Sequence, residues 1–288
     1  MRVAHSPEEL GGGERAVAIG TFDGVHIGHR RTLEAAVSAG PTPTVVTFHP
    51  HPRVALGYQV ELICSLERRL ELIAEAGIED ALVVEFTSDV ATLDPEDFAH
   101  EVLGAIGTRV VVAGEDFRFG RRRRGDLDLL RSLGFGVEPV ELVEGASSST
   151  IRRLVAEGEV AEAAHPLGRP VEVEGIVVAG DARGGTLGFP TANLSVDPEL
   201  LVPGFGIYAG AVGEHRAATS IGLNPHYGGS ERRIEAFLLD FEGDLYGSRI
   251  RLEVWQRLRD ERAFASEADL IEQIALDVAA TRQATRPA

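Results

Sequence analysis

Short apolar runs alternate with amphipathic segments through the first half of the chain. Between the runs, apolar residues recur at helical spacing over residues 28–39, 66–76, 94–105 and 126–133. Strands that are apolar without interruption are buried on both faces, and helices between consecutive strands join them in parallel. The pattern therefore predicts an α/β domain with a parallel sheet, whose ligands bind at the carboxyl ends of the strands. The predicted strands are 16–22, 44–48, 81–86, 109–117 and 137–143.

The pattern changes after about residue 165, where strand-like segments are separated by Gly, Pro and Asp turns. A last amphipathic helix is predicted over 266–284, and the helical stretch 148–157 connects the two halves. We therefore expect a small β-barrel with a C-terminal helix, and two domains, 1–165 and 166–288. The predicted barrel strands are 170–179, 206–213, 216–221, 232–241 and 248–256.

Length and composition fit a folded two-domain protein. The 288 residues suffice for two cores, and no apolar run reaches the roughly 18 residues of a membrane span. The first residues lack the apolar core of a signal peptide. The single cysteine, Cys64, permits neither an internal disulfide nor a thiolate metal cage. We expect a cytoplasmic protein without a membrane partner.

The charge pattern restricts the ligands. A formal charge of −17 argues against general nucleic-acid binding, which needs a basic face. All 28 basic residues are arginine, so lysine Schiff-base chemistry and a lysine-dependent phosphate loop are excluded. Phosphates would be bound by arginines, histidines, backbone amides or a metal ion.

The stretch "GTFDGVHIGH" (20–29) joins a predicted strand to a predicted helix. Backbone amides at a helix N-terminus are unpaired and bind anions. His26 and His29 are three residues apart and would face the same ligand, where they can stabilise charge on nucleotide phosphates as the α-phosphate is attacked. Two alternatives are a pair of surface histidines beside a tight turn and a zinc pair, although neither a second cysteine nor a nearby third histidine supports zinc.

Two later segments of the first half also suit a nucleotide. Asp116 and Phe117 follow a strand, where a carboxylate or its peptide can contact an adenine or ribose edge, and Phe119 offers a flat apolar surface. "SSSTIRRL" (147–154) opens a helix with hydroxyl groups and an arginine, which suits a triphosphate. The alternatives are simple helix capping by the serines and a solvated loop for the arginine run 121–124.

The second half contains the glycine-rich stretch "GDARGGTLGFPTANL" (180–194). Its glycines, including Gly184 and Gly188, allow a ligand to approach the backbone closely, and Thr191 and Asn193 then project oxygen atoms from an extended segment. Hydroxyl and amide oxygens beside phosphates suit Mg²⁺. The alternative is a glycine-rich hairpin without a ligand.

Alternation along "RRIEAFLLDFEGDLYG" (232–247) places Glu235, Phe237 and Leu239 on one face of a strand. We expect this face to point inward. An acidic side chain on an apolar inward face is unfavourable unless it is used, so Glu235 is a candidate general base for a ligand hydroxyl.

Four motifs of the first half resemble, in order, those of the adenylyltransferase module of bacterial bifunctional riboflavin kinase/FAD synthetases, a nucleotidylyltransferase with a His-x-Gly-His signature. They are "GTFDGVHIGHRRTL", "TFHPHPR" (47–53), "AGEDFRFGRRRRGD" (113–126) and "SSSTIRRL". The resemblance implies a Rossmann-like domain in which His26, His29 and Arg152 act in catalysis. Ser149 stands where the family commonly has threonine. The nucleotide-binding residues implied here are Gly20, Phe22, Asp23, Gly28, Asp116, Phe117, Ser148 and Ser149.

The second half is similar to the riboflavin kinase module of the same family, through "TLGFPTANL", "GIYAG", "IGLNP", "EAFLLDFEGDLYG" and "LRDERAF". The resemblance implies that Thr191 and Asn193 bind ATP and magnesium, that Gly184 and Gly188 contact the nucleotide, and that Glu235 activates the ribityl 5′-hydroxyl. This chain departs from the family's common residues at Ala179, Gly185, His226 and Ala236.

The resemblance implies two reactions with riboflavin, FMN and ATP as small-molecule substrates and Mg²⁺ as the metal. Riboflavin and ATP give FMN and ADP in the second domain, and FMN and ATP give FAD and pyrophosphate in the first. Two other hypotheses are an enzyme with one active module and a flavin-binding regulatory protein that retains both folds without turnover.

Overall fold

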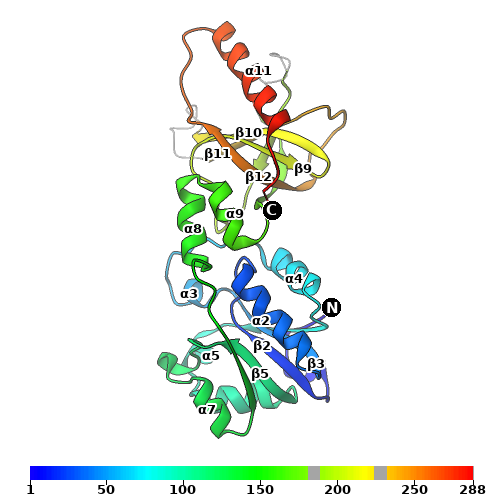
Figure 1. Ribbon diagram of the computed structural model, residues 1–288, viewed down its shortest axis with the longest axis vertical. Coiled ribbons are helices and arrows are strands. Elements are labelled where there is room, and N and C mark those ends of the chain that lie inside the picture. The colour runs from blue at the N-terminus through cyan, green and yellow to red at the C-terminus, as the bar shows by residue number, and fades with distance from the viewer. Residues whose placement is uncertain (181–188, 224–231, 288) are drawn as a thin grey trace. The chain divides into compact units, whose positions relative to one another are not determined.

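The computed structural model of the protein describes residues 1–180, 189–223 and 232–287 (Figure 1). The chain forms two compact units. The first contains residues 1–60 and 65–146, and the second contains residues 61–64 and 147–288.

The first unit is built on a parallel sheet, as the apolar runs predict. Over the described residues it has six strands in the order β1-β4-β3-β2-β5-β6, and every neighbouring pair is parallel. The chain continues from β2 to β3 on one side, whereas β5 pairs with the other side of β2. The carboxyl end of β2 is therefore the topological switch point, where α/β folds bind ligands. The strands are β1 (Arg2–Ala4), β2 (Arg15–Ile19), β3 (Thr42–His49), β4 (Asp80–Glu85), β5 (Thr108–Gly114) and β6 (Gly136–Val140).

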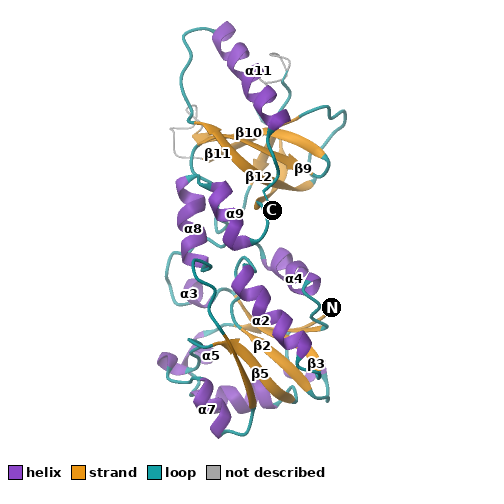
Figure 2. Ribbon diagram, viewed as in Figure 1, coloured by secondary structure: helices purple, strands orange, loops and turns teal. Residues whose placement is uncertain are grey.

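Helices cover both faces of this sheet (Figure 2). Alternate residues of β2 enter different cores: Ala18 packs with α2 and α4, whereas Val17 packs with α6, η1 and α7. The helix predicted over 94–105 is α6 continued by a π-helical turn, η1. The helical elements are α1 (Pro7–Leu10), α2 (Ile27–Ser38), α3 (Pro52–Ala55), α4 (Leu66–Glu75), α5 (Ser88–Thr92), α6 (Pro95–Phe98), η1 (Ala99–Gly104), the 3₁₀ turn η2 (Arg121–Arg123) and α7 (Leu127–Ser132).

The second unit is a closed barrel with helices, also as predicted. Its described strands follow the order β10-β11-β8-β7-β12-β9 around the barrel, and each pairing with an adjacent strand is antiparallel. The elements are α8 (Ser148–Glu157), α9 (Val160–Leu167), β7 (Val171–Val178), β8 (Ala192–Ser195), β9 (Gly206–Val212), β10 (His215–Leu223), β11 (Arg232–Leu238), β12 (Arg249–Arg259) and α11 (Glu267–Gln283).

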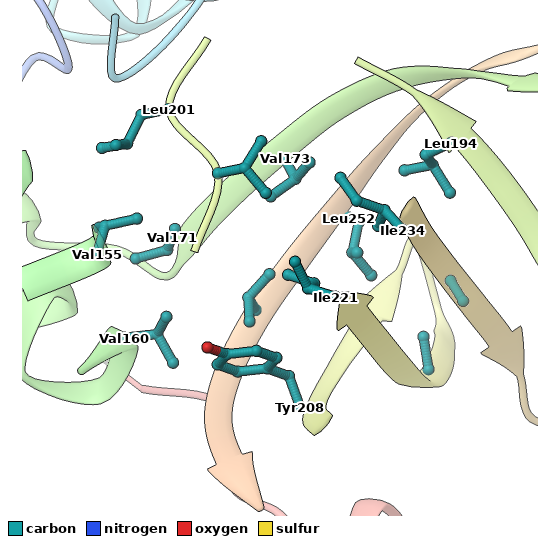
Figure 3. Packing of buried hydrophobic residues seen from close by; sticks show 14 of the residues in the cluster. Val155, Val160, Val171, Val173, Leu194, Leu201, Tyr208, Ile221, Ile234 and Leu252 are labelled. Atoms are coloured by element: carbon teal, nitrogen blue, oxygen red, sulfur yellow. The ribbon is translucent and has the colours of Figure 1, made fainter. Parts of the chain in front are cut away.

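Helices α8 and α9 belong to the core of the barrel unit. Figure 3 shows Val155 of α8 and Val160 of α9 in the apolar cluster that also contains Val171 and Tyr208. Apart from residues 61–64, the compact unit thus begins at residue 147, upstream of the boundary at 165 that the sequence suggests. The change from helical to strand-like pattern lies near 165, but a compact unit is defined by the core into which side chains pack.

A four-residue segment, 61–64, also packs in the second unit. The Leu62 amide donates to the Glu199 carbonyl at 2.7 Å, and the Leu62 carbonyl accepts from the Leu201 amide at 2.8 Å. Leu62 is itself buried. Such a short segment has no hydrophobic period, so the sequence pattern does not identify it.

Candidate active sites

The turn between β2 and α2 has an unusual backbone. Phe22 has φ +50°, Gly24 has φ +81° and Val25 has φ +39°. A positive φ is rare for bulky and β-branched residues, and it persists only where the surroundings enforce it. Phe22 and Val25 are both buried, in the same core as α2. The turn therefore has one defined shape at the switch point of the sheet.

The two histidines of this turn are in contact, as expected from their spacing. His26 is the N-cap of α2, and its Nδ1 accepts a hydrogen bond from the His29 amide at 3.3 Å. The rings stack with centroids 3.6 Å apart and planes 16° apart, and the Phe22 ring meets the His29 ring edge-on. Because Nδ1 of His26 is an acceptor, the proton of the neutral ring is assigned to Nε2, which can donate to an anion.

The glycines of this motif make room for the aromatic rings. A Cβ at Gly28 would lie 3.2 Å from Nδ1 and Cε1 of His26, and a Cβ at Gly20 would lie 3.3 Å from the Phe22 ring. These are tighter than ordinary contacts, so glycine permits the positions of the His26 and Phe22 rings. This packing role is not evident from the sequence, in which the glycines suggest only the approach of phosphates.

The other polar candidates of the first unit differ in exposure. Asp23 is buried in the turn, whereas Asp116 is exposed after β5. Phe117 is half-buried and stacks on Phe119, with centroids 5.6 Å apart. Phe119 is 7% exposed and is a core residue, so the expectation that it offers a flat surface is wrong. Phe117 is the more accessible ring, and the arginine run 121–124 is exposed to solvent.

Ser148, Ser149 and Arg152 lie in α8 and thus in the second compact unit. The helix is capped by Ser147, whose Oγ accepts from the Thr150 amide at 3.1 Å. Arg152 Nε donates to the Glu61 carbonyl at 2.7 Å. Capping thus uses Ser147, and the participation of Arg152 and the two serines in a phosphate site stays a prediction.

The polar residues expected in the barrel lie together. Glu235 of β11 pairs with Asn193 of β8 across the sheet, and the Thr191 hydroxyl donates to Glu235 Oε1 at 3.3 Å. Arg233 joins them, with Nη2 2.8 Å from Glu235 Oε1 and Nε 3.3 Å from Asn193 Oδ1. Arg233 is absent from the residues predicted from sequence, although its i, i+2 relation to Glu235 places both on one face of the strand.

The expected inward orientation of Glu235 is wrong. Ile234, Ala236 and Leu238 face the barrel core, whereas Glu235 and Phe237 lie on the other face and are partly exposed. The sequence pattern groups Glu235 with Leu239, and the burial of Leu239 suggests an inward face. Leu239, however, lies beyond the end of β11, so its burial does not show which way the side chains of the strand face. Glu235 is thus accessible without being in the core.

Glycine also shapes this site. A Cβ at Gly180 would collide with the Asn193 side chain, so glycine permits the close approach of the backbone to the amide. Gly184 and Gly188, and the departures Gly185 and His226, lie outside the described residues.

Each half of the chain matches a family model: FAD synthetase over residues 12–151 and riboflavin kinase over residues 167–285. A Listeria monocytogenes protein named bifunctional riboflavin kinase/FMN adenylyltransferase is 36% identical, over 93% of this chain and 91% of its own length. The chain belongs to the family of bifunctional riboflavin kinase/FMN adenylyltransferases. Family members from Bacillus subtilis and Escherichia coli are 36% and 34% identical, over 91% and 94% of this chain.

The fold of this family member also matches the crystal structure of a Streptococcus pneumoniae protein named as a macrolide-efflux protein. The TM-score is 0.89, at 31% identity over 98% of this chain and 99% of that one. The likeness supports the two-unit fold. The word efflux belongs to the name of the Streptococcus pneumoniae protein and is not applied to this chain. In the part of this chain that the structure describes, no helix is long and apolar enough to cross a membrane.

Two departures from the family's common residues can be located in the structure. Ala236 is fully buried in the barrel core, where a small side chain is accommodated. Ala179 is exposed just after β7. Neither departure replaces Thr191, Asn193 or Glu235.

Proposed function

We propose that this family member makes FAD in two steps. The barrel unit transfers the γ-phosphoryl group of ATP to riboflavin and releases ADP. The sheet unit then joins the AMP part of a second ATP to FMN and releases pyrophosphate. The observation that supports this assignment best is that each unit brings its predicted polar side chains into contact, His26 with His29 and Thr191 with Glu235.

In the kinase step, Glu235 accepts the proton of the ribityl 5′-hydroxyl as that oxygen attacks the γ-phosphorus of ATP. Thr191 holds the carboxylate through its hydroxyl hydrogen bond. Glu235 is partly exposed, so its carboxylate is accessible to a substrate hydroxyl. Gly184 and Gly188 are proposed to contact the nucleotide.

The donor set of the barrel site fits magnesium. The Thr191 hydroxyl and the Asn193 amide oxygen are hard oxygen ligands, and Mg²⁺ takes few protein ligands when phosphates and waters complete its shell. When bound, Mg²⁺ neutralises charge on the transferred phosphoryl group.

In the adenylyl step, an FMN phosphate oxygen attacks the α-phosphorus of ATP, and the bond to pyrophosphate breaks. Charge accumulates on the phosphates, and the donors at the N-terminus of α2, with His26 and His29, stabilise it. Arg152 is proposed to balance charge on the leaving pyrophosphate. The residues proposed to bind the nucleotide are Gly20, Phe22, Asp23, Gly28, Asp116, Phe117, Ser148 and Ser149.

The test is to incubate the protein with riboflavin, ATP and Mg²⁺ and to separate riboflavin, FMN and FAD by chromatography. We expect His29→Ala to reduce FAD formation by at least about 100-fold and to leave FMN formation intact, because electrostatic donors to phosphates are worth that much. Glu235→Ala should do the reverse when FMN is supplied. Loss of both activities from either folded variant would contradict the assignment of separate sites.

We further propose a cytoplasmic location and no nucleic-acid partner, in keeping with the strongly acidic composition. The expected partners are the small-molecule substrates.

A further inference from the structure

Arg233 occupies the centre of the barrel site without a place in the proposed mechanism. It lies two residues before Glu235 on β11, so both side chains leave the same face of the strand. Its Nη2 donates to Glu235 Oε1 at 2.8 Å, and its Nε donates to Asn193 Oδ1 at 3.3 Å. Thr191 donates to the same Oε1. One guanidinium thus binds the base and one of the two metal ligands of the proposed function.

This cluster is partly shielded from solvent. The side chain of Arg233 is 22% exposed and that of Glu235 is 28% exposed. Coulomb interactions are stronger at such positions than in bulk water, because fewer waters screen them. The positive charge of Arg233 therefore acts on whatever enters the site.

A guanidinium and a magnesium ion compete for these oxygens. Mg²⁺ binds oxygen lone pairs at about 2.0–2.1 Å, and arginine has only N–H donors to offer. Asn193 Oδ1 has two lone pairs, and a metal ion bound to one of them would lie beside the guanidinium that donates to the other. Two cations on one small oxygen cluster also repel each other, which disfavours both occupying it together.

We propose that Arg233 is a resident counter-cation of the kinase site. It holds Asn193 and Glu235 in place while metal and substrates are absent, and it releases their oxygens when the magnesium nucleotide and riboflavin bind. This inference rests on the proposed assignment of Thr191 and Asn193 to the metal. It makes Arg233 a positioning residue, whose charge lowers the affinity of the site for divalent cations.

The experiment measures Mn²⁺ binding to the full-length protein with saturating ADP, from the electron paramagnetic resonance signal of free Mn²⁺. Arg233→Gln removes the charge and retains N–H donors, so the Mn²⁺ dissociation constant should fall about three- to fivefold, the range for a partly exposed charge pair. Arg233→Lys keeps the charge and should bind Mn²⁺ as the wild type does.

Arg232→Gln is the matched control. It removes the same charge from the adjacent residue, which lies on the opposite face of β11, is exposed, and places its guanidinium carbon 5.9 Å from the Phe205 ring centroid. We expect no change in Mn²⁺ affinity. An equal tightening in Arg232→Gln would mean that net charge alone is responsible, and it would overturn the proposal.

Thr191→Ala separates the role of Arg233 from the metal site itself. If it weakens Mn²⁺ binding while Arg233→Gln leaves the affinity unchanged or lowers it, the counter-cation role is wrong and the metal site stands. If Thr191→Ala binds Mn²⁺ as the wild type does, the metal site is wrong and the role of Arg233 falls with it. Thermal unfolding of each variant confirms that a folded protein is compared.

Discussion

His26 has two structural roles at the residue scale. It caps α2 by accepting the His29 amide, and it stacks on the ring of the same residue. The cap fixes the orientation of the His26 ring, and the ring contact fixes that of His29 relative to it. Both imidazoles are therefore held at the helix N-terminus, which is the preorganisation that the proposed adenylyl step requires.

The contact between Gly28 and the His26 ring predicts that activity can be lost here without loss of stability. A Cβ at Gly28 would press on Nδ1 and Cε1 at 3.2 Å and displace the ring. Alanine is also the better helix former, by up to about 1 kcal/mol. We expect Gly28→Ala to retain or raise the melting temperature. The rate of FAD formation should fall at least about tenfold, because small displacements of catalytic groups lower a rate by factors of this order.

Two comparisons control this experiment. Gly12→Ala adds the same methyl group where nothing lies within 4 Å, and it should leave FAD formation unchanged. FMN formation by Gly28→Ala reports on the other unit and should stay at the wild-type level. Wild-type FAD synthesis by Gly28→Ala would show that the ring position is unimportant.

At the scale of elements, buried arginines tie strands together at opposite ends of the parallel sheet. At the carboxyl end, Arg69 of α4 donates through Nη1 to the Thr21 carbonyl at 2.8 Å, the Phe48 carbonyl at 3.1 Å and the Thr47 hydroxyl at 3.3 Å. At the amino end, Arg15 donates to the Ile106 carbonyl at 2.8 Å. Arg69 therefore joins the strand ends next to the turn between β2 and α2, and Arg15 lies at the other end of the strands.

This placement predicts different consequences for equivalent substitutions. Arg69→Met and Arg15→Met should each lower the free energy of unfolding by about 1–3 kcal/mol, because buried carbonyls lose donors and, at Arg15, the buried Asp80 carboxylate loses one of its two arginine partners. Arg69→Met should in addition raise the KM for ATP in FAD formation, since the Thr21 carbonyl lies in the turn between β2 and α2. The measurements are chemical denaturation and steady-state kinetics well below the melting temperature.

The conservative variant distinguishes positioning from stability alone. Arg69→Lys can still donate to the Thr21 carbonyl and should recover part of the ATP affinity. If Arg15→Met raised the KM for ATP as much as Arg69→Met, general loosening of the sheet would explain both, and the positioning role of Arg69 would be excluded.

At the scale of the whole molecule, the barrel unit includes two helices, α8 and α9, that precede its strands in the chain. The barrel core contains Ile151 and Val155 of α8 and Val160 of α9, all nearly inaccessible to solvent. These residues precede position 166, where the sequence pattern suggests that the second domain begins. Burying each such side chain stabilises a fold by roughly 1.5–3 kcal/mol before the entropy of ordering the helices is subtracted.

Two fragments test this dependence. A fragment of residues 147–288 should have a free energy of unfolding higher than that of 166–288 by about 2–4 kcal/mol, because it retains α8 and α9. Urea denaturation followed by tryptophan fluorescence measures the difference, since Trp255 lies in β12. Equal stabilities would show that the two helices contribute nothing to the barrel.

The residues that are predicted well are those whose neighbours along the chain determine their position. The helix expected over 148–157 is α8, and His26 and His29 meet because they are three residues apart at a helix start. The face of Glu235 is predicted wrongly because alternation alone does not show where a strand ends. Short elements such as β1 and α3 are missed because three or four residues are too few to show a hydrophobic periodicity.

By itself, the sequence determined the two kinds of architecture, because hydrophobic periodicity is a property of neighbouring residues, and it determined the order of the motifs, whose resemblance to a known family supplied most of the candidate site residues. Only the tertiary structure decided that Arg233 enters the Thr191–Asn193–Glu235 cluster, that Phe119 is buried, and that α8, α9 and residues 61–64 pack with the barrel. These depend on contacts between distant segments, and such contacts are set by the pairing of strands and the filling of a core.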